Sequence, residues 1–211
     1  MNFQVNVHAI GDMANRLVLQ AFNAILPNTT SHLRNAQHRF RIEHAQILHP
    51  DDINLAESMG IIMSMQPTHA TSDMFYALSR LGSWRLENGA YAQGTFARNA
   101  NTTLILGSDF PVEPPSPIRG IFAAIRRLDP DSRKSPHGEG GWYEEQKLTF
   151  EEALNGFTRD AAYAAFSEEW MGSIETGKWA DWVVVEESGD GIEMGEGVVT
   201  ETWVGGKKVF G

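Results

Sequence analysis

The chain has 211 residues, of which 42% are apolar and 21% are charged, an ordinary composition for a folded globular protein. Its 17 basic and 27 acidic side chains leave a formal net charge of −10, so we expect no nucleic-acid and no anionic-membrane partner. The absence of cysteine excludes disulfides, thiolate metal ligands and thiol nucleophiles, and no apolar run reaches the ~20 residues that cross a bilayer.

The first four fifths of the chain alternate short apolar strands with helices. Strands are expected at residues 3–7, 39–44, 61–65 and 104–106, and helices at 13–26, 50–59, 118–128, 149–157 and 161–166. Residues 70–100 are expected to be irregular apart from a helix at about 92–99, and residues 129–145 to form a loop. Alternation of this kind is typical of βαβ units with a parallel sheet.

The last forty residues have a different pattern. After Gly172 the sequence predicts strands at 180–185, 198–204 and 207–210, separated by glycine-rich turns and without helices. We therefore expect two parts, residues 1–171 and residues 172–211. Within the first part, Thr149 followed three residues later by Glu152 predicts a capping box at the start of a helix.

One acidic residue follows the predicted strand at 104–106. Gly107 and Ser108 end that strand and deliver Asp109, and Pro111 prevents the strand from continuing. A carboxylate at the carboxyl end of a buried strand is where α/β enzymes place catalytic groups. Taken alone, Asp109 fits a turn or helix cap at least as well.

Two other predicted strands end in a side chain that can bind a metal, His8 and His44. In a right-handed succession of parallel strands, His8, His44 and Asp109 would converge on one rim of the sheet. Two imidazoles and a carboxylate are a normal ligand set for Zn²⁺ and similar ions. Such an ion activates water, and a nearby carboxylate can accept the proton.

Each of these residues also has a simpler interpretation. His8 fits a structural histidine that bonds a backbone carbonyl, and His44 fits half of a surface pair with Glu43. His69, which follows Pro67, fits a loop residue as well as a substrate contact. The agreement of strand-end position, order and residue type at His8, His44 and Asp109 favours the metal site.

Several segments together resemble the amidohydrolase superfamily, in particular its family 3 branch with YtcJ-like proteins and N-substituted formamide deformylases. The segments are VHAIGD at 7–12, RIEHAQ at 41–46, MQPTH at 65–69, LGSDFPV at 106–112, LTFEEALNGFTRDAA at 148–162 and GSIETGKWADWVVV at 172–185. The resemblance covers nearly the whole chain, from strand 5 of the family's barrel onward.

The resemblance implies a role for each candidate residue. His8 and His44 would be metal-binding histidines after strands 5 and 6, and His69, after strand 7, would lie near the substrate. Asp109 would be the strand 8 aspartate that binds metal and carries the proton. The family fold is a (β/α)₈ TIM barrel with a composite β-sandwich. Its usual reaction is hydrolysis of non-peptide carbon–nitrogen bonds in small amide-type substrates, with one or two divalent ions, most often Zn²⁺.

The chain also departs from the family pattern. It contains neither the His-x-His motif expected after strand 1 nor the bridging lysine expected after strand 4. A complete barrel takes ~250 residues, and about 170 are assigned to it here. We therefore expect a partial TIM barrel, equivalent to strands 5–8, in residues 1–171, followed by β-sandwich strands in residues 172–211.

Three hypotheses follow from these observations. The chain is the carboxyl-terminal fragment of a metal-dependent hydrolase, with little activity alone and a missing amino-terminal half as its partner. Alternatively it is an inactive half-barrel that forms a homodimer or binds another protein, or a binding module of unrelated topology. The start of the chain does not resemble a signal peptide, which favours the cytoplasm if Met1 is the true start.

Overall fold

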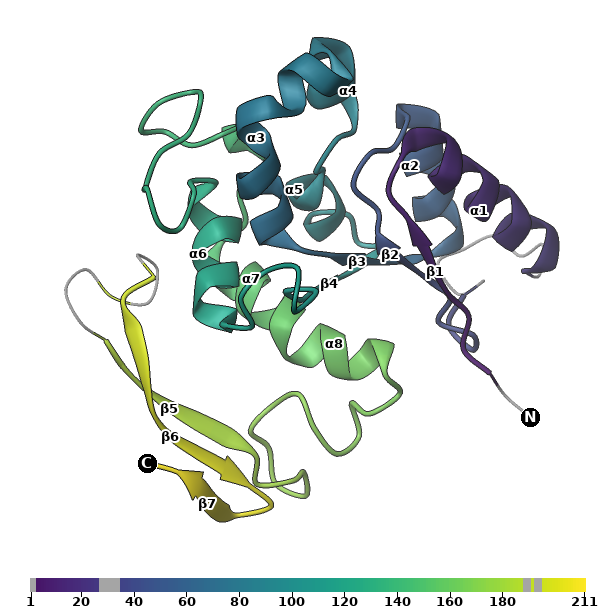
Figure 1. Ribbon diagram of the computed structural model, residues 1–211. Coiled ribbons are helices and arrows are strands. Elements are labelled where there is room, and N and C mark those ends of the chain that lie inside the picture. The colour runs from purple at the N-terminus through teal and green to yellow at the C-terminus, as the bar shows by residue number, and fades with distance from the viewer. Residues whose placement is uncertain (1–2, 27–34, 188–190, 192–194) are drawn as a thin grey trace.

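A computed structural model describes residues 3–26, 35–187, 191 and 195–211 (Figure 1). In chain order the elements are β1 (Asn6–Ala9), α1 (Asp12–Ile25), β2 (Arg41–His44), α2 (Pro50–Met59), β3 (Ile62–Met65), α3 (Pro67–Leu81), α4 (Ser83–Asn88), α5 (Gln93–Ala97), β4 (Thr103–Leu106), α6 (Pro117–Arg126), the 3₁₀ helix η2 (Glu144–Gln146), α7 (Phe150–Phe157), α8 (Arg159–Ala164), β5 (Trp182–Glu187), β6 (Gly197–Val204) and β7 (Lys207–Phe210). None of the helices in these ranges has both the length and the apolar composition needed to cross a membrane.

The first four strands form a parallel sheet in the order β1-β2-β3-β4. Their registers pair Ala9 with His44 and Met65 with Leu106, so the carboxyl ends of the strands lie at one edge of the sheet. Every residue of β3 is buried, as expected for a strand of a parallel sheet that is covered on both faces. The α/β class and the parallel sheet predicted from the sequence are confirmed.

Helices cover this sheet, and their ends carry clear local signals. Helix α2 begins at Pro50, a favoured first residue, and ends at Gly60, whose φ of 69° suits glycine. Helices α1 and α2 lie side by side next to β1 and β2, whereas α7 and α8 pack against β4 (Figure 1). The predicted capping box of α7 is present: Glu152 N donates to Thr149 Oγ1 at 3.1 Å, and Thr149 N donates to Glu152 Oε2 at 2.7 Å.

The main hydrophobic core lies between the parallel sheet and its helices. Its fully buried members include Leu19, Ile42, Met63, Phe96 and Ala153. A second apolar cluster joins α3, α4 and the segment before η2, and it includes Met74, Leu86, Tyr91 and Trp142. This second cluster lies beyond the carboxyl ends of the strands and supports the loops of that rim.

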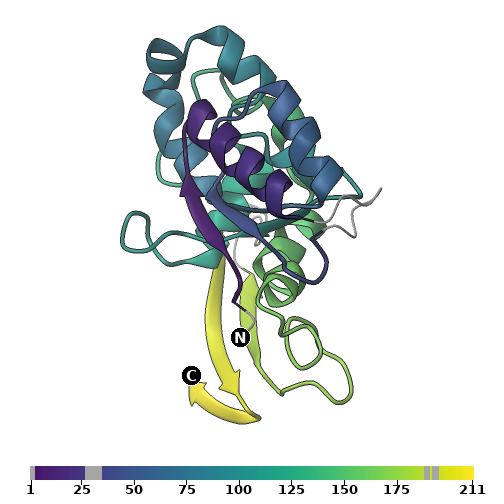
Figure 2. The same ribbon diagram turned by 90° about the vertical axis from the view of Figure 1, so that its right-hand side faces the viewer.

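The three strands predicted after Gly172 are present, and they form an antiparallel sheet in the order β5-β6-β7 (Figure 2). The chain reaches it through a segment held by Arg39, whose guanidinium stacks on the rings of Tyr163 and Phe166 at 3.8 and 4.2 Å. The same guanidinium donates from Nη1 to Glu168 Oε2 at 2.8 Å. Arg39 therefore ties the start of β2 to the connection that follows α8.

The structure corrects several sequence-based boundaries. Residues 70–100 are not largely irregular, because α3, α4 and α5 account for most of them. Helix α3 is hard to recognise because Phe75 and Leu78 are exposed while Met74 and Ala77 are buried, so apolar residues lie on both of its faces. His69 accordingly lies in the first turn of α3 rather than in a loop. Strand β1 extends to Ala9, so His8 lies inside the strand and not after it.

The capping box gives a direct test of how α7 is stabilised. Thr149→Ala removes the hydroxyl that accepts the Glu152 amide, so we expect the free energy of unfolding to fall by about 1 kcal/mol. Ser116→Ala is a matched control, because Ser116 precedes α6 without making a side-chain capping bond. Urea denaturation of both variants measures the difference, and equal losses would contradict a specific role for the capping box.

Candidate functional site

His8 and His44 are neighbours at the carboxyl edge of the parallel sheet. The Nδ1 atom of His8 lies 2.9 Å from Nε2 of His44, and the two ring centroids are 4.9 Å apart. His8 is exposed on β1, at the end of the sheet order, whereas His44 is buried at the end of β2. The expectation that these two histidines meet at one rim is met.

The backbone at His44 has an uncommon conformation for a residue with a side chain. His44 and Ala45 have φ values of 74° and 44°, in the left-handed region that normally favours glycine. This conformation ends β2 abruptly, and Ala45 N then donates to Ala9 O at 3.1 Å. Backbone strain of this kind persists only where surrounding contacts hold it, and it is frequent at functional sites.

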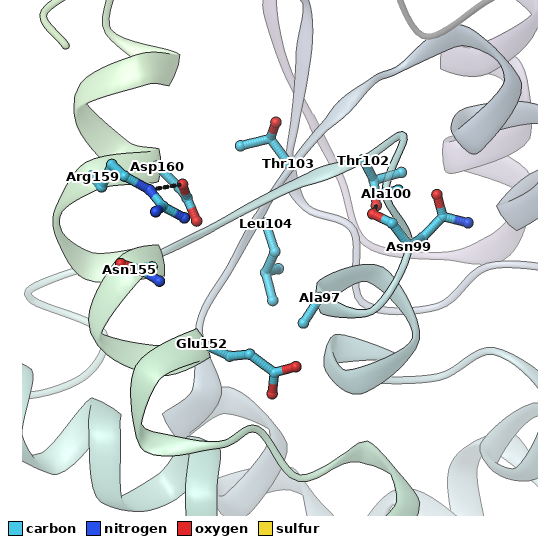
Figure 3. Close-up of a pocket in the computed structure, with 10 residues that line it drawn as sticks. All are labelled: Ala97, Asn99, Ala100, Thr102, Thr103, Leu104, Glu152, Asn155, Arg159 and Asp160. Carbon is cyan, nitrogen blue, oxygen red and sulfur yellow. Dashed lines mark hydrogen bonds and ion pairs between the residues drawn. The ribbon is translucent and has the colours of Figure 1, made fainter.

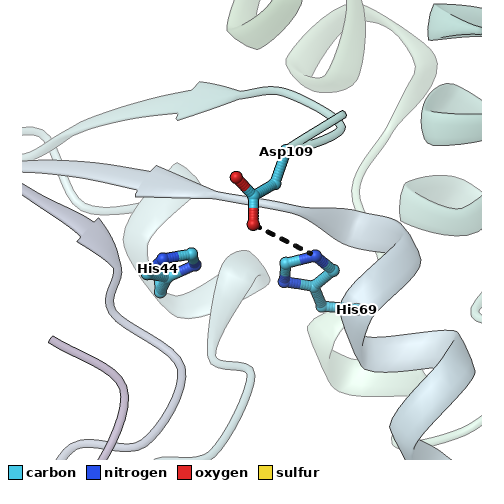
Figure 4. A group of neighbouring side chains, drawn as sticks. All are labelled: His44, His69 and Asp109. Atoms are coloured by element: carbon cyan, nitrogen blue, oxygen red, sulfur yellow. Dashed lines mark ion pairs between the residues drawn. The ribbon is translucent and has the colours of Figure 1, made fainter. Parts of the chain in front are cut away.

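His69 and Asp109 complete a group with His44 (Figure 4). One ligand atom from each of these three residues can be chosen so that all lie within 4.8 Å of one another. His69 Nε2 is 3.9 Å from Asp109 Oδ2, and the rings of His44 and His69 are nearly parallel with centroids 5.9 Å apart. Asp109 also has a positive φ, 57°, so the turn after β4 directs it back toward the two histidines.

The surroundings of His69 disfavour its protonated form. Burial is the main cause that lowers the pKa of His69, and the Asp109 carboxylate opposes that effect. Its Nε2 atom is buried and has no hydrogen-bond partner among the described residues. A buried ring nitrogen without a partner is costly unless a ligand uses its lone pair. The Asp109 side chain is 35% exposed, so water can reach its carboxylate.

Gln66 defines which nitrogen of His44 is available to a ligand. Its Oε1 lies 3.2 Å from His44 Nδ1, inside the buried part of the rim. An amide oxygen only accepts hydrogen bonds, so this contact places the proton of neutral His44 on Nδ1 and leaves on Nε2 the lone pair that faces His8 Nδ1 at 2.9 Å. A ring fixed at one nitrogen by a polar partner is the usual arrangement of a metal-binding histidine.

The donor set fits a divalent cation. Imidazole nitrogens and a carboxylate oxygen bind Zn²⁺ and similar ions at ~2.0–2.2 Å, which separates neighbouring ligand atoms by ~3.3 Å in a tetrahedron. The 3.9 Å between His69 Nε2 and Asp109 Oδ2 is close to that separation. An ion would also satisfy the unpartnered nitrogen of His69, so the residues present fit the group.

The structure thus brings the four residues selected from the sequence to one rim, but it groups them differently from the expected set of His8, His44 and Asp109. His44, His69 and Asp109 form the compact group, and His8 adjoins it through His44 only. Sequence reasoning missed Gln66 as a contributor, although it lies in the MQPTH segment directly after β3. Its position one residue after a buried strand was the available signal.

A separate pocket of about 240 Å³ lies at the opposite end of β4 (Figure 3). It is lined by side chains around Thr102 and Leu104 and by polar residues of α7 and α8, among them Glu152, Arg159 and Asp160. Arg159 pairs with Asp160 at 3.2 Å, and Glu152 belongs to the capping box. The pocket is lined by no histidine, and its charged groups already have these partners, so we assign no chemistry to it.

Comparison with known proteins identifies the family. The sequence pattern of the amidohydrolase family matches residues 1–210. YtcJ of Bacillus subtilis is 34% identical over 189 residues, which cover 89% of this chain and 32% of YtcJ. N-substituted formamide deformylase of Arthrobacter pascens is 26% identical over 214 residues, which cover 97% of this chain and 35% of the deformylase.

The structural comparison agrees. A metal-dependent hydrolase of Pyrococcus furiosus superposes with a TM-score of 0.64 at 28% identity, over 83% of this chain and 32% of the hydrolase. The chain therefore belongs to the amidohydrolase family, in its family 3 branch, and the resemblance recognised from the sequence is confirmed. It spans about a third of the length of the curated relatives it matches.

The environment of His69 can be tested by NMR titration of the metal-free protein. We expect the pKa of His69 to lie below the ordinary value of a histidine, because burial disfavours the imidazolium ion. Asp109→Asn removes the carboxylate that favours the imidazolium ion, so it should lower the pKa of His69 further. Asp131→Asn, which removes a carboxylate paired with Arg119, serves as the control and should leave His69 unchanged. A rise in the Asp109→Asn protein would refute the assigned geometry.

Proposed function

We propose that this chain carries half of the active site of a metal-dependent hydrolase that cleaves non-peptide carbon–nitrogen bonds. The observation that supports this proposal most directly is the compact group of His44, His69 and Asp109 at the carboxyl edge of a parallel sheet. The carbon–nitrogen substrate class is supported by the name of a relative, the N-substituted formamide deformylase. The substrate would be a small amide-type molecule.

In this proposal His8, His44 and Asp109 hold a divalent ion, for which we propose Zn²⁺, and His69 faces the substrate. One or two ions would occupy the complete site. When bound, such an ion activates water and polarises the carbonyl group to be attacked. His44 offers the lone pair of Nε2, with Nδ1 held by Gln66. Because His69 Nε2 lacks a partner and lies near Asp109, a second arrangement has His69 as a ligand and His8 outside the ligand set.

The carboxylate of Asp109 is the proposed proton carrier. It is partly exposed, so its Oδ2 can accept a proton from attacking water and pass it to the leaving nitrogen. Neutral His69, whose pKa is lowered by burial, can donate or accept a hydrogen bond without adding charge to the site. The two groups therefore divide the roles, with proton transfer at Asp109 and orientation of the substrate at His69.

Metal binding by His44 is the first test. His44→Ala removes the central imidazole of the rim, and we expect the affinity for Zn²⁺ to fall at least ~100-fold because a direct ligand is lost. Equilibrium dialysis with elemental analysis gives both stoichiometry and affinity. His137→Ala is the matched control, because His137 is exposed in the loop before η2 and does not belong to the group at the rim, and it should bind as the unaltered chain does. Unchanged affinity in His44→Ala would remove His44 from the ligand set.

The same assay separates the two arrangements of the histidines. If His8 is a ligand, His8→Ala should weaken binding by ~100-fold or more, whereas His69→Ala should change it by less than ~10-fold. The reverse pattern would identify His69 as the ligand. Loss of affinity in neither variant would contradict both arrangements.

We further propose that residues 1–171 correspond to strands 5–8 of a TIM barrel and residues 172–211 to part of a composite β-sandwich. Two facts support this assignment: the spatial order of β1 to β4 follows the chain order, and the chain spans about a third of its relatives. The missing partner would be the amino-terminal half of the barrel. Reading the transcript and genome upstream of Met1 tests the idea, since an in-frame extension encoding a His-x-His strand end is expected.

A second candidate function is a half-barrel without catalysis that self-associates or binds another protein. It is favoured by exposed apolar side chains at the β1 side of the molecule, including Phe3, Met13, Leu17 and Ile25, each more than half exposed. Analytical ultracentrifugation distinguishes the candidates when combined with metal analysis. A metal-free homodimer would support this second function, and a monomer that binds metal at His44 would support the first.

A further inference from the structure

The strained turn that presents His44 requires support from outside β2. His44 and Ala45 both have a positive φ, and each such residue costs of order 1–3 kcal/mol. The next residue, Gln46, is buried and is held by both its backbone and its side chain. Its carbonyl accepts from the Tyr91 amide at 2.6 Å, and its Nε2 donates to Asp73 Oδ2 at 3.4 Å.

Asp73 is the point where these contacts meet. It lies on α3 four residues after His69, so the two side chains share one face of the helix. Its Oδ2 accepts from the Tyr91 hydroxyl at 2.6 Å as well as from Gln46, and its Oδ1 accepts from the Tyr76 hydroxyl. One carboxylate therefore joins the helix that carries His69 to the turn that follows His44.

Tyr91 is held in place by burial and by a hydrogen bond to its backbone. It is 3% exposed in the second apolar cluster, and its φ of 51° is also in the left-handed region. Fully buried Arg127 donates from Nη1 to the Tyr91 carbonyl at 3.3 Å and from Nε to the Trp142 carbonyl at 2.8 Å. Burial, together with the hydrogen bond to Asp73, raises the pKa of Tyr91, so its hydroxyl remains a donor.

We propose that Asp73 is a positioning residue that sets the relative placement of His44 and His69 in the metal site. This inference rests on the proposed function, because it assigns Asp73 a role through these two side chains. Asp73 does not belong to the group of His44, His69 and Asp109 that could hold an ion, although its negative charge acts on His69. Its three donors come from the β2 turn, from α3 and from the segment before α5, and two of these three elements carry a histidine of the site.

The proposal predicts a graded effect of substitutions. Asp73→Ala removes acceptors for all three donors, Asp73→Asn keeps one carbonyl acceptor, and Tyr91→Phe removes one donor while it preserves the buried ring. Tyr143→Phe is the matched control: Tyr143 packs on the same cluster, and its hydroxyl makes no hydrogen bond within the described part of the chain. A residue that supports metal ligands changes metal affinity ~10–100-fold when lost.

Two measurements on the full chain test the proposal. In the metal-free protein, histidine ring NMR signals, with His44 assigned from the His44→Ala variant, report the position of His44. We expect them to shift most in Asp73→Ala, less in Asp73→Asn and Tyr91→Phe, and not in Tyr143→Phe. Titration with Co²⁺ then measures affinity and the visible spectrum of the bound ion. We expect about 10-fold weaker binding in Asp73→Ala, with a changed spectrum.

The outcomes distinguish a failure of the proposed function from a failure of the positioning role of Asp73. If the unaltered chain binds no Co²⁺, the proposed function fails, and the NMR signals of His44 still decide whether Asp73 positions it. If Co²⁺ binds and the Asp73 and Tyr91 variants keep the same His44 signals, affinity and spectrum, the metal site stands and the positioning role is refuted. Equal changes in Tyr143→Phe would also refute it, because they would indicate a general effect on the apolar cluster.

Discussion

Backbone conformation at two strand ends determines where the candidate site lies. His44 and Asp109 have φ values of 74° and 57°, which side chains larger than glycine adopt only when neighbouring contacts compensate the cost. The chain leaves β2 at His44 and turns at Asp109 shortly after the end of β4, and both positions direct a ligand-type side chain toward the rim. A glycine at either position would relieve the strain but would remove the imidazole or the carboxylate. The chain therefore keeps the strained backbone at these two positions together with the side chains that the site uses.

The parallel sheet supplies the second condition for the site. Parallel pairing in consecutive order places the ends of β2, β3 and β4 side by side, where His44 is the last residue of β2, and His69 and Asp109 follow β3 and β4. The buried apolar side chains of these strands, such as Ile42, Met63 and Leu104, fix the register, because a one-residue slip would turn core side chains outward. The register continues to the turn before Asp109, because Met65 pairs with Leu106 and Gly107 N donates to Met65 O at 3.1 Å.

The sequence predicted the elements with strong local signals and missed those defined by tertiary contacts. The capping box at Thr149 and the strand before Asp109 were recognisable, because each depends on residues close in the chain. Helix α3 was missed, because its Phe75 and Leu78 are exposed and obscure the helical pattern. The roles of Gln66 and Asp73 could not be predicted, since their partners lie 22 and 18 residues away and meet only in the folded rim.

The three histidines of the rim differ in their burial and in the contacts that hold their side chains in place. His44 is buried between neighbouring strands and has a side-chain partner at Nδ1, and His69 is buried in the first turn of α3. His8 is exposed on β1, which pairs on one side with β2 and has no strand on its other side in the described part of the chain. Its contact with His44 therefore has the least backbone support among the contacts of the rim in the described part of the chain. The interior strands β2 and β3 are paired on both sides, whereas the edge strands β1 and β4 are paired on one side only.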